Sequence, residues 1–129
     1  MSRAKARRWH RKHAQTGKQA QIVVDFLQLV KASAAKSRRS REEEVGEISR
    51  TLKALAKELR TSVLALASLN RECEKRTDKR PMPSDLRDSG SIESDADLIV
   101  MVYRDELYNA ESKDKGIAEL IVGKHRGGP

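Results

Sequence analysis

Aromatic residues, cysteines and long apolar runs are scarce in this sequence. Only 3% of the 129 residues are aromatic, so a hydrophobic core has to rest on Leu, Ile, Val and Ala. Cys73 is the one cysteine, which excludes an internal disulfide and favours a reducing, cytoplasmic location. The longest apolar runs, about six residues, are far too short for a membrane-spanning helix. We therefore expect neither a membrane partner nor a secretory signal.

What the sequence has in excess is positive charge. Lysine and arginine number 27 against 19 acidic residues, which gives a formal net charge of +8. This excess favours a polyanionic partner, most often nucleic acid, although a solvated basic surface explains it equally well. The length suits one domain with one modest core.

The first half of the chain predicts a helix, a buried strand and a second helix. Ser2–Ala14 contains good helix formers with a narrow apolar stripe, and Ile22–Val24 has the composition of a buried strand. A polar basic linker, expected to be a mobile loop, covers Lys31–Arg41. A capping-box pattern, S-x-x-E, then begins a helix expected over Ser40–Leu59, whose apolar residues recur at spacings of three and four.

The second half predicts three further strands. They are Ser62–Leu69, Leu98–Tyr103 and Ile117–Val122, and a polar turn joins the last two. The middle one is too evenly apolar to be half-solvated. A long charged loop covers Asn70–Ser91, and a short turn is expected at Ile92–Ala96. Apolar strands with intervening helices predict an α/β fold, with a mostly parallel sheet flanked by helices.

The stretch QIVVDFLQLV places Asp25 directly after β-branched residues. A carboxylate at the end of a buried strand needs a cation, a metal or hydrogen-bond donors. Ligands of α/β sheets bind at the carboxyl ends of strands, so Asp25 is a candidate for contact with hydrated Mg²⁺, as in the Walker B arrangement of P-loop NTPases. On this motif alone, an aspartate that caps a neighbouring loop is the simpler interpretation.

Five longer segments carry more information than this motif. In chain order they are VDFLQLV, EISRTLKALAKEL, LALASLNRECEKR, KRPMPSDLRDSGSIESDADLIVMVYRDE and KGIAELIVGKHRGGP. Together they closely resemble the C-terminal, RecA-like motor domain of the DnaB family of replicative DNA helicases, over nearly all of residues 1–129. The resemblance implies a homo-hexameric ring on single-stranded DNA, which uses ATP and Mg²⁺ for 5′–3′ unwinding at the replication fork. Primase and a helicase loader are the further partners that it implies.

The resemblance also gives roles to single residues. Asp25 matches the Walker B carboxylate, which would face the Mg²⁺ shell of a bound nucleotide. Arg87, Asp88 and Gly90 match the family's DNA-binding loop, in which arginine charge and close backbone approach grip phosphates without reading sequence. Without the resemblance, Arg87 would be interpreted as a solvated surface cation.

Two cations near the end of the chain, Lys124 and Arg126, match the family's Lys-x-Arg pair. In the ring this pair reaches the γ-phosphate of ATP held by the adjacent subunit, where it stabilises charge on the transferred phosphoryl group. A basic tail is the simpler interpretation without the resemblance. We expect the role to require that neither side chain folds back onto its own domain.

The sequence departs from the family pattern at three positions, and it lacks one motif. Ser68 stands where the family has a glutamine that relays between the γ-phosphate and the DNA loop, Asp88 replaces a glutamate, and Gly127 replaces an asparagine. No G-x-x-x-x-G-K-[ST] phosphate loop occurs, so the chain resembles the second half of a motor domain and is incomplete as a RecA-like unit. We therefore expect no ATPase activity from the isolated chain, and marginal stability with an unprotected sheet edge.

Two alternatives stay open at this point. The chain can be a stand-alone basic DNA-binding module, or one that docks onto an intact helicase ring without catalysis. It can also be another RecA-like ATPase, such as a relative of recombinases or clock proteins. The stretch DLRDSGSIESDADLIVMVYRDE favours the helicase family over those relatives.

Overall fold

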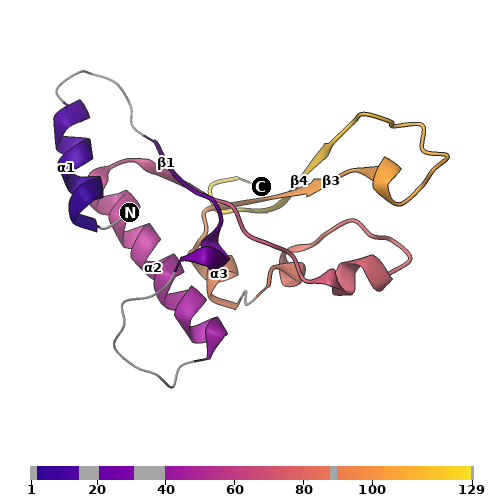
Figure 1. Ribbon diagram of the computed structural model, residues 1–129, viewed down its shortest axis with the longest axis horizontal. Coiled ribbons are helices and arrows are strands. Elements are labelled where there is room, and N and C mark those ends of the chain that lie inside the picture. Colours follow the sequence, from indigo (N-terminus) through magenta and orange to yellow (C-terminus); the bar gives the residue numbers. More distant parts are fainter. Residues whose placement is uncertain (1–2, 15–20, 31–39, 88–89, 129) are drawn as a thin grey trace.

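The computed structural model describes residues 3–14, 21–30, 40–87 and 90–128 (Figure 1). Its helices and strands are α1 (Arg3–Ala14), β1 (Gln21–Val24), α2 (Arg41–Leu59), β2 (Ser62–Ala65), α3 (Gly90–Asp95), β3 (Leu98–Tyr103) and β4 (Glu119–His125). Short 3-10 helices lie between them, at Leu27–Leu29, Arg71–Lys75, Pro83–Asp85 and Asp105–Leu107. Within these ranges no helix is long and apolar enough to cross a membrane. The predicted order of the two longer helices and the four strands is confirmed, and α3 stands where a loop and a short turn were expected. The linker predicted at 31–41 falls mostly outside the described residues.

The start and end of α2 follow from its sequence. The Ser40 hydroxyl accepts a hydrogen bond from the Glu43 backbone at 3.2 Å, and the Glu43 carboxylate accepts one from the Ser40 backbone at 2.9 Å. This reciprocal pair is the predicted capping box, and it satisfies two amide groups that have no partner inside the helix. At the other end Arg60 adopts the left-handed conformation, with φ 48°, and closes the helix.

The strands form two separate pairs among the described residues. β1 and β2 are parallel, with Gln21 opposite Ser62 and Val24 opposite Ala65. β3 and β4 are antiparallel, with a register shift between Ile99 and Val100. The predicted mostly parallel sheet is therefore wrong for the second pair. β3 and β4 follow one another through a connection without a crossover helix, and such consecutive strands pair as a hairpin.

One face of β3 is exposed, which corrects the expectation that this strand is buried on both sides. Ile99, Met101 and Tyr103 are buried, whereas Leu98 and Val102 are more than half exposed. The covered face packs on Leu86, Leu69 and other apolar residues of the preceding segments. Antiparallel pairs commonly have one such covered face and one exposed face. The even apolar composition of the strand conceals this alternation.

The hydrophobic core is divided into small clusters rather than the single core that the length suggests. One cluster joins Ala6 of α1 and Ile22 of β1 to α2, and a second joins Leu27 to the first half of α2. A third lies under the β3–β4 hairpin. In Figure 1 the hairpin and the loop over residues 70–87 project together from the side opposite α1. β1, β2 and the segments that follow them connect the two ends of the molecule.

Candidate functional site

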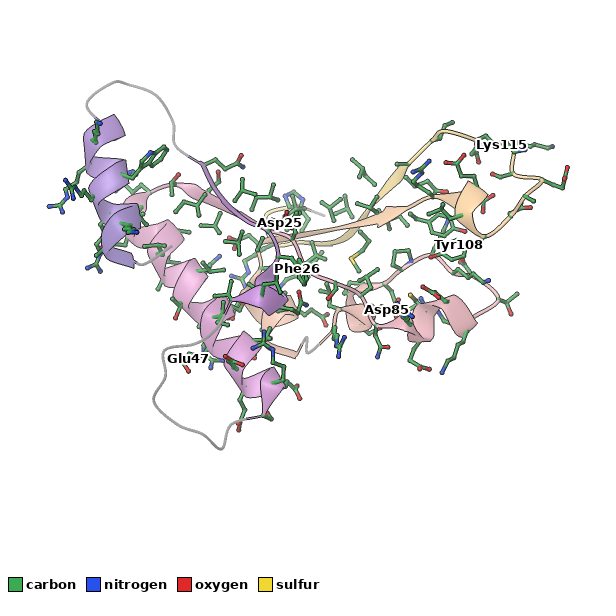
Figure 2. The ribbon with its side chains drawn as sticks, in the orientation of Figure 1. Asp25, Phe26, Glu47, Asp85, Tyr108 and Lys115 are labelled. Atoms are coloured by element: carbon green, nitrogen blue, oxygen red, sulfur yellow. The ribbon has the colours of Figure 1, made fainter. Side chains whose placement is uncertain are left out.

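Asp25 stands where the sequence predicted it, directly after β1 (Figure 2). Its peptide bond to Phe26 is cis, and a 3-10 turn at Leu27–Leu29 follows. The side chain is exposed, so this carboxylate is open to solvent rather than buried as the strand pattern suggests. Strand ends of parallel pairs are where α/β proteins bind ligands. The position therefore suits a group that contacts a bound molecule.

The turn after Asp25 is joined to the continuation of β2 by hydrogen bonds. The Leu66 amide donates to the Val24 carbonyl at 2.9 Å, and the Leu27 amide donates to the Leu66 carbonyl at 2.7 Å. One step further, the Ser68 amide donates to the side-chain oxygen of Gln28 at 3.2 Å. The parallel pairing is thus extended past the ends of both strands. The segment that contains Asp25 is thus hydrogen-bonded to the segment that contains Ser68.

Ser68 also contacts the start of the predicted DNA loop. Its carbonyl accepts a hydrogen bond from the Arg87 amide at 3.2 Å, and the neighbouring Leu69 forms an isolated antiparallel bridge with Leu86. Arg87 is exposed, as a residue that binds a phosphate has to be, and Gly90 begins α3. Asp88 lies outside the described residues. The structure therefore brings the segments of Asp25 and Arg87 together through Ser68, one of the positions at which the sequence was seen to depart from the family pattern.

A buried ion pair shapes the loop that carries Arg87. The guanidinium of Arg76 donates two hydrogen bonds to Asp85, at 2.8 and 2.6 Å, and the Met82 amide donates a third at 2.9 Å. Asp85 is 7% exposed. The hydrogen bonds from Arg76 lower the pKa of Asp85 most, burial opposes them, and the Met82 amide assists. Sequence reasoning missed this pair because residues 70–91 carry no periodic signal that relates the two positions.

A second cluster fastens the same loop to the hairpin. Arg80 donates two hydrogen bonds to Glu119 of β4, at 3.1 and 2.6 Å, and lies over the ring of Tyr103 at 4.8 Å. Tyr103 in turn stacks on Tyr108, with ring centroids 5.7 Å apart. Burial raises the pKa of Tyr103, and its hydrogen bond to Asp105 raises that pKa further. The loop that ends at Arg87 is therefore held at two places.

Lys124 and Arg126 are folded onto the C-terminal end of α3, contrary to the expectation that both stand clear of their own domain. The Lys124 ammonium donates to the carbonyl of Glu93 and, at 3.4 Å, to that of Ser94. The Arg126 guanidinium donates to the Ser94 carbonyl at 2.7 Å and pairs with Asp97 at 3.3 Å. The last carbonyls of a helix lack intrahelical donors and carry partial negative charge, so they attract cations.

Asp97 joins this arrangement to α2. Its carboxylate forms an ion pair with Lys53 of α2 as well as with Arg126. The pKa of Asp97 is lowered, chiefly by the hydrogen bond from Lys53, with smaller contributions from the charges of Lys53 and Arg126. Nothing in the sequence around Asp97 indicates either partner, because Lys53 and Arg126 lie 44 and 29 residues away.

The residues present suit an indirect contact with Mg²⁺ better than a metal cage. The described part of the chain holds no group of three or more His, Cys, Asp or Glu side chains that could bind a metal ion. Mg²⁺ keeps several of its waters and is commonly held through one or two carboxylates together with substrate phosphates. A single exposed carboxylate such as Asp25 fits that mode.

Comparisons with known proteins give consistent matches. The family described as "DnaB-like helicase C terminal domain" matches residues 1–129. The chain is 57% identical over 127 residues to the replicative DNA helicase DnaB of Haemophilus influenzae, and 55% identical over 108 residues to that of Geobacillus stearothermophilus. These matches cover 98% and 84% of the chain.

Two solved structures have the same fold. One is described as an ATPase domain, with a TM-score of 0.90 and 47% identity over 98% of the chain. The other is a DnaB-like replicative helicase described together with its interactions with primase, with a TM-score of 0.87 and 44% identity over 100% of the chain. The chain spans 43% and 31% of these two structures, and about a quarter of the curated relatives, 26% and 24%.

Proposed function

The chain belongs to the DnaB-like helicase C-terminal domain family, and we propose that it is part of the motor of a hexameric, ATP-driven DNA helicase. In this proposal it supplies three things: the carboxylate Asp25, the DNA-binding loop at Arg87, Asp88 and Gly90, and the cations Lys124 and Arg126. Its substrates are ATP with Mg²⁺ and duplex DNA, which the ring unwinds in the 5′–3′ direction at the replication fork. The observation that carries the proposal is 57% identity to a replicative helicase over 98% of the chain.

Each group has a physical task. Asp25 would hold a nucleotide-bound Mg²⁺ by accepting hydrogen bonds from its water. Arg87 contacts a phosphate of single-stranded DNA, with Gly90 leaving room for the backbone to approach. Arg126 and Lys124, once released from the carbonyls of Glu93 and Ser94, place positive charge near the phosphoryl group held by the neighbouring subunit. Mg²⁺ and ATP supply charge neutralisation and the transferable phosphoryl group.

The hydrogen bonds between the segments that carry Asp25 and Arg87 supply a route for coupling. Val24, Leu66 and Leu27 share backbone hydrogen bonds, and Ser68 links Gln28 to Arg87. A nucleotide-dependent shift at Asp25 thus reaches the DNA loop through the backbone of Ser68, although this side chain is short. We further infer that primase and a helicase loader are partners of the complete ring, and that the ring works in the cytoplasm.

A chimera tests this function directly. Residues 1–129 would replace the matching 127 residues of the Haemophilus influenzae replicative helicase. We expect the chimera to hydrolyse ATP and unwind a forked duplex, Asp25→Ala to abolish both activities, and Arg126→Ala to lower kcat about a thousandfold. Asp114→Ala, at an exposed turn position, is the matched control. An Asp25→Ala chimera as active as the parent would contradict the assignment.

The isolated chain should not turn over ATP. Its 129 residues contain no phosphate-loop motif, and therefore no backbone cradle and lysine for the β- and γ-phosphates. A steady-state ATPase assay with single-stranded DNA should show no turnover above buffer. Clear turnover that disappears in Asp25→Ala would show that this expectation is wrong.

A second function is favoured by the same missing motif together with the basic surface of α1. Arg8, Arg11 and Lys12 of that helix are exposed, and the chain carries a net charge of +8. A chain of this kind can dock onto an intact ring and donate Lys124 and Arg126 without a nucleotide site of its own. Adding the chain to an intact DnaB-type helicase distinguishes the two functions, because a docking module would slow unwinding at substoichiometric amounts.

A further inference from the structure

The cations assigned to the neighbour's phosphate already have partners within their own chain. Lys124 and Arg126 together donate to two carbonyls at the end of α3, those of Glu93 and Ser94. The backbone reinforces this contact, since the Arg126 amide donates to the Asp97 carbonyl at 2.8 Å. A side chain cannot make these contacts and reach a phosphate on another subunit at the same time. Docking of Lys124 and Arg126 within their own chain therefore competes with their binding to a phosphate on the neighbouring subunit.

Asp97 is the charged component of the docking site. It holds Arg126 on one side and Lys53 on the other, with exposed side-chain fractions of 64% for Asp97, 52% for Arg126 and 23% for Lys53. Exposed pairs of this kind are weak and easily broken. The Arg126 side chain can therefore leave this contact easily, and the contact contributes little to the stability of the fold.

The docking site and the DNA loop share one short helix. α3 begins at Gly90, the last residue of the predicted DNA loop, and ends at Asp95. The carbonyls that receive the cations belong to Glu93 and Ser94, and Asp97 lies two residues beyond the helix. α3 packs tightly on α2, because an added Cβ at Gly46 would lie 2.5 Å from the Ser91 hydroxyl. α3, and with it the docking site at its C-terminal end, is therefore held closely against α2.

We propose that Asp97 and the C-terminal carbonyls of α3 form a docking site in cis for Arg126 and Lys124. Asp97 is then a positioning residue, which sets the fraction of Arg126 that is free to reach a phosphate. The proposal rests on the proposed function, since it assumes that the pair binds phosphate in trans. The docking site competes with that phosphate for Arg126 and Lys124, and it lies at the C-terminal end of α3.

The docking can be measured in the 129-residue chain without catalysis. The ¹⁵N heteronuclear NOE of the Arg126 Nε–Hε group reports how far its guanidinium is restrained. We expect a restrained group in the wild-type chain and a mobile one in Asp97→Asn. Asp114→Asn removes the same charge at an exposed turn and should leave the Arg126 signal unchanged. An Arg126 group that is equally mobile in the wild-type chain and in Asp97→Asn would overturn the proposal.

The competition is measured with inorganic tripolyphosphate as the probe. By isothermal titration, Asp97→Asn should bind it on the order of threefold more tightly than Asp114→Asn, because a larger fraction of Arg126 is free. Equal affinity of these two variants would overturn the competition. If Arg126→Ala binds tripolyphosphate as tightly as the wild-type chain, the phosphate-binding role of Arg126 in the proposed function fails instead. The NOE measurement still decides whether Arg126 is docked.

Discussion

At the scale of single residues, removing the charge of Asp85 should destabilise the 70–87 loop most. It accepts three hydrogen bonds, two from Arg76 and one from the Met82 amide, in a position that is 7% exposed. Breaking a partly buried pair of this kind leaves one charge without its partner. We predict that Asp85→Asn lowers the free energy of opening of the 70–87 loop by about 2 kcal/mol, or roughly thirtyfold in amide protection.

Hydrogen exchange at the amides of Met82 and Asn70 measures this effect, because both donate to Asp85. The matched control is Asp78→Asn, whose side chain is 72% exposed. Its carboxylate lies 3.8 Å from the Arg80 guanidinium and accepts a hydrogen bond from the Arg80 amide at 3.0 Å. That substitution should change protection by less than about 0.5 kcal/mol. Equal effects from the two substitutions would show that the Asp85 pair contributes no more than a surface contact.

The contribution of Asp85 should also depend on pH in one direction. Its pKa in the folded chain lies below the ordinary value of 3.8, so the folded state favours the charged form. The stabilisation is therefore fully present above pH 3.8 and is lost as the pH falls through the lowered pKa. The difference in loop protection between the wild-type chain and Asp85→Asn should be constant from pH 7 to about pH 5 and shrink in stronger acid. A difference that grows on acidification would contradict this cause.

Residue positions in the candidate site were easier to predict than residue contacts. The place of Asp25 follows from a local pattern, because β-branched residues before a carboxylate mark a strand end. The docking of Arg126 does not, since its partners on and after α3 lie 29 to 32 residues earlier in the chain. The ion pair of Arg76 with Asp85 likewise joins positions of an irregular loop. Contacts between distant residues are set by packing that a single sequence does not display.

At the scale of secondary-structure elements, the contact between α2 and α3 depends on Gly46. A Cβ at this position would lie 2.5 Å from the Ser91 hydroxyl and 3.0 Å from its Cβ. Alanine favours a helix by about 1 kcal/mol over glycine, whereas overpacking costs about 1–3 kcal/mol. We predict that Gly46→Ala destabilises the chain by about 1 kcal/mol net, measured by urea unfolding.

A double substitution tests the cause. With Ser91→Gly in place the obstruction is removed, so Gly46→Ala should become stabilising by its helix propensity alone. Gly127→Ala is the control, because an added Cβ there meets nothing within 4 Å. If Gly46→Ala has the same effect with and without Ser91, close packing of α3 on α2 is not the reason for the glycine.

The two longer helices and β3 were predicted accurately, whereas α3 stands where a loop and a short turn were expected. α1 and α2 were placed within a residue or two at each end, because caps and apolar periodicity are local signals. β2 stops at Ala65 rather than Leu69, and β4 runs from Glu119 to His125 rather than over Ile117–Val122. Strand limits depend on which neighbour supplies hydrogen bonds. That information lies elsewhere in the chain.

At the scale of the whole molecule, the division into small apolar clusters predicts low stability. Each cluster contains only three or four buried residues. The outer face of the β3–β4 hairpin meanwhile exposes a continuous apolar row, made of Leu98, Val100, Val102, Leu120 and Val122. Exposed patches of this kind promote association. We predict that the isolated chain associates with rising concentration and lacks a sharp, reversible thermal transition.

Sedimentation velocity over a range of concentrations tests this expectation. Val102 and Leu120 face each other across the hairpin, so the pair of substitutions Val102→Thr and Leu120→Thr should reduce association most directly. A soluble monomer with a sharp, reversible transition would contradict it. The family itself was predictable from five ordered segments of sequence, whereas this exposed face was not, because the strand that carries it is apolar on both sides.

The central claim is that Asp25 works in its own subunit while Arg126 works in the next one around a ring. Mixed rings of the chimeric helicase test it, with Asp25→Ala subunits combined with Arg126→Ala subunits. Neither variant alone should hydrolyse ATP at an appreciable rate. At equal amounts we predict about a quarter of the parent ATPase rate, because about one interface in four pairs an intact Asp25 with an intact Arg126. No recovery at any mixing ratio would contradict the claim.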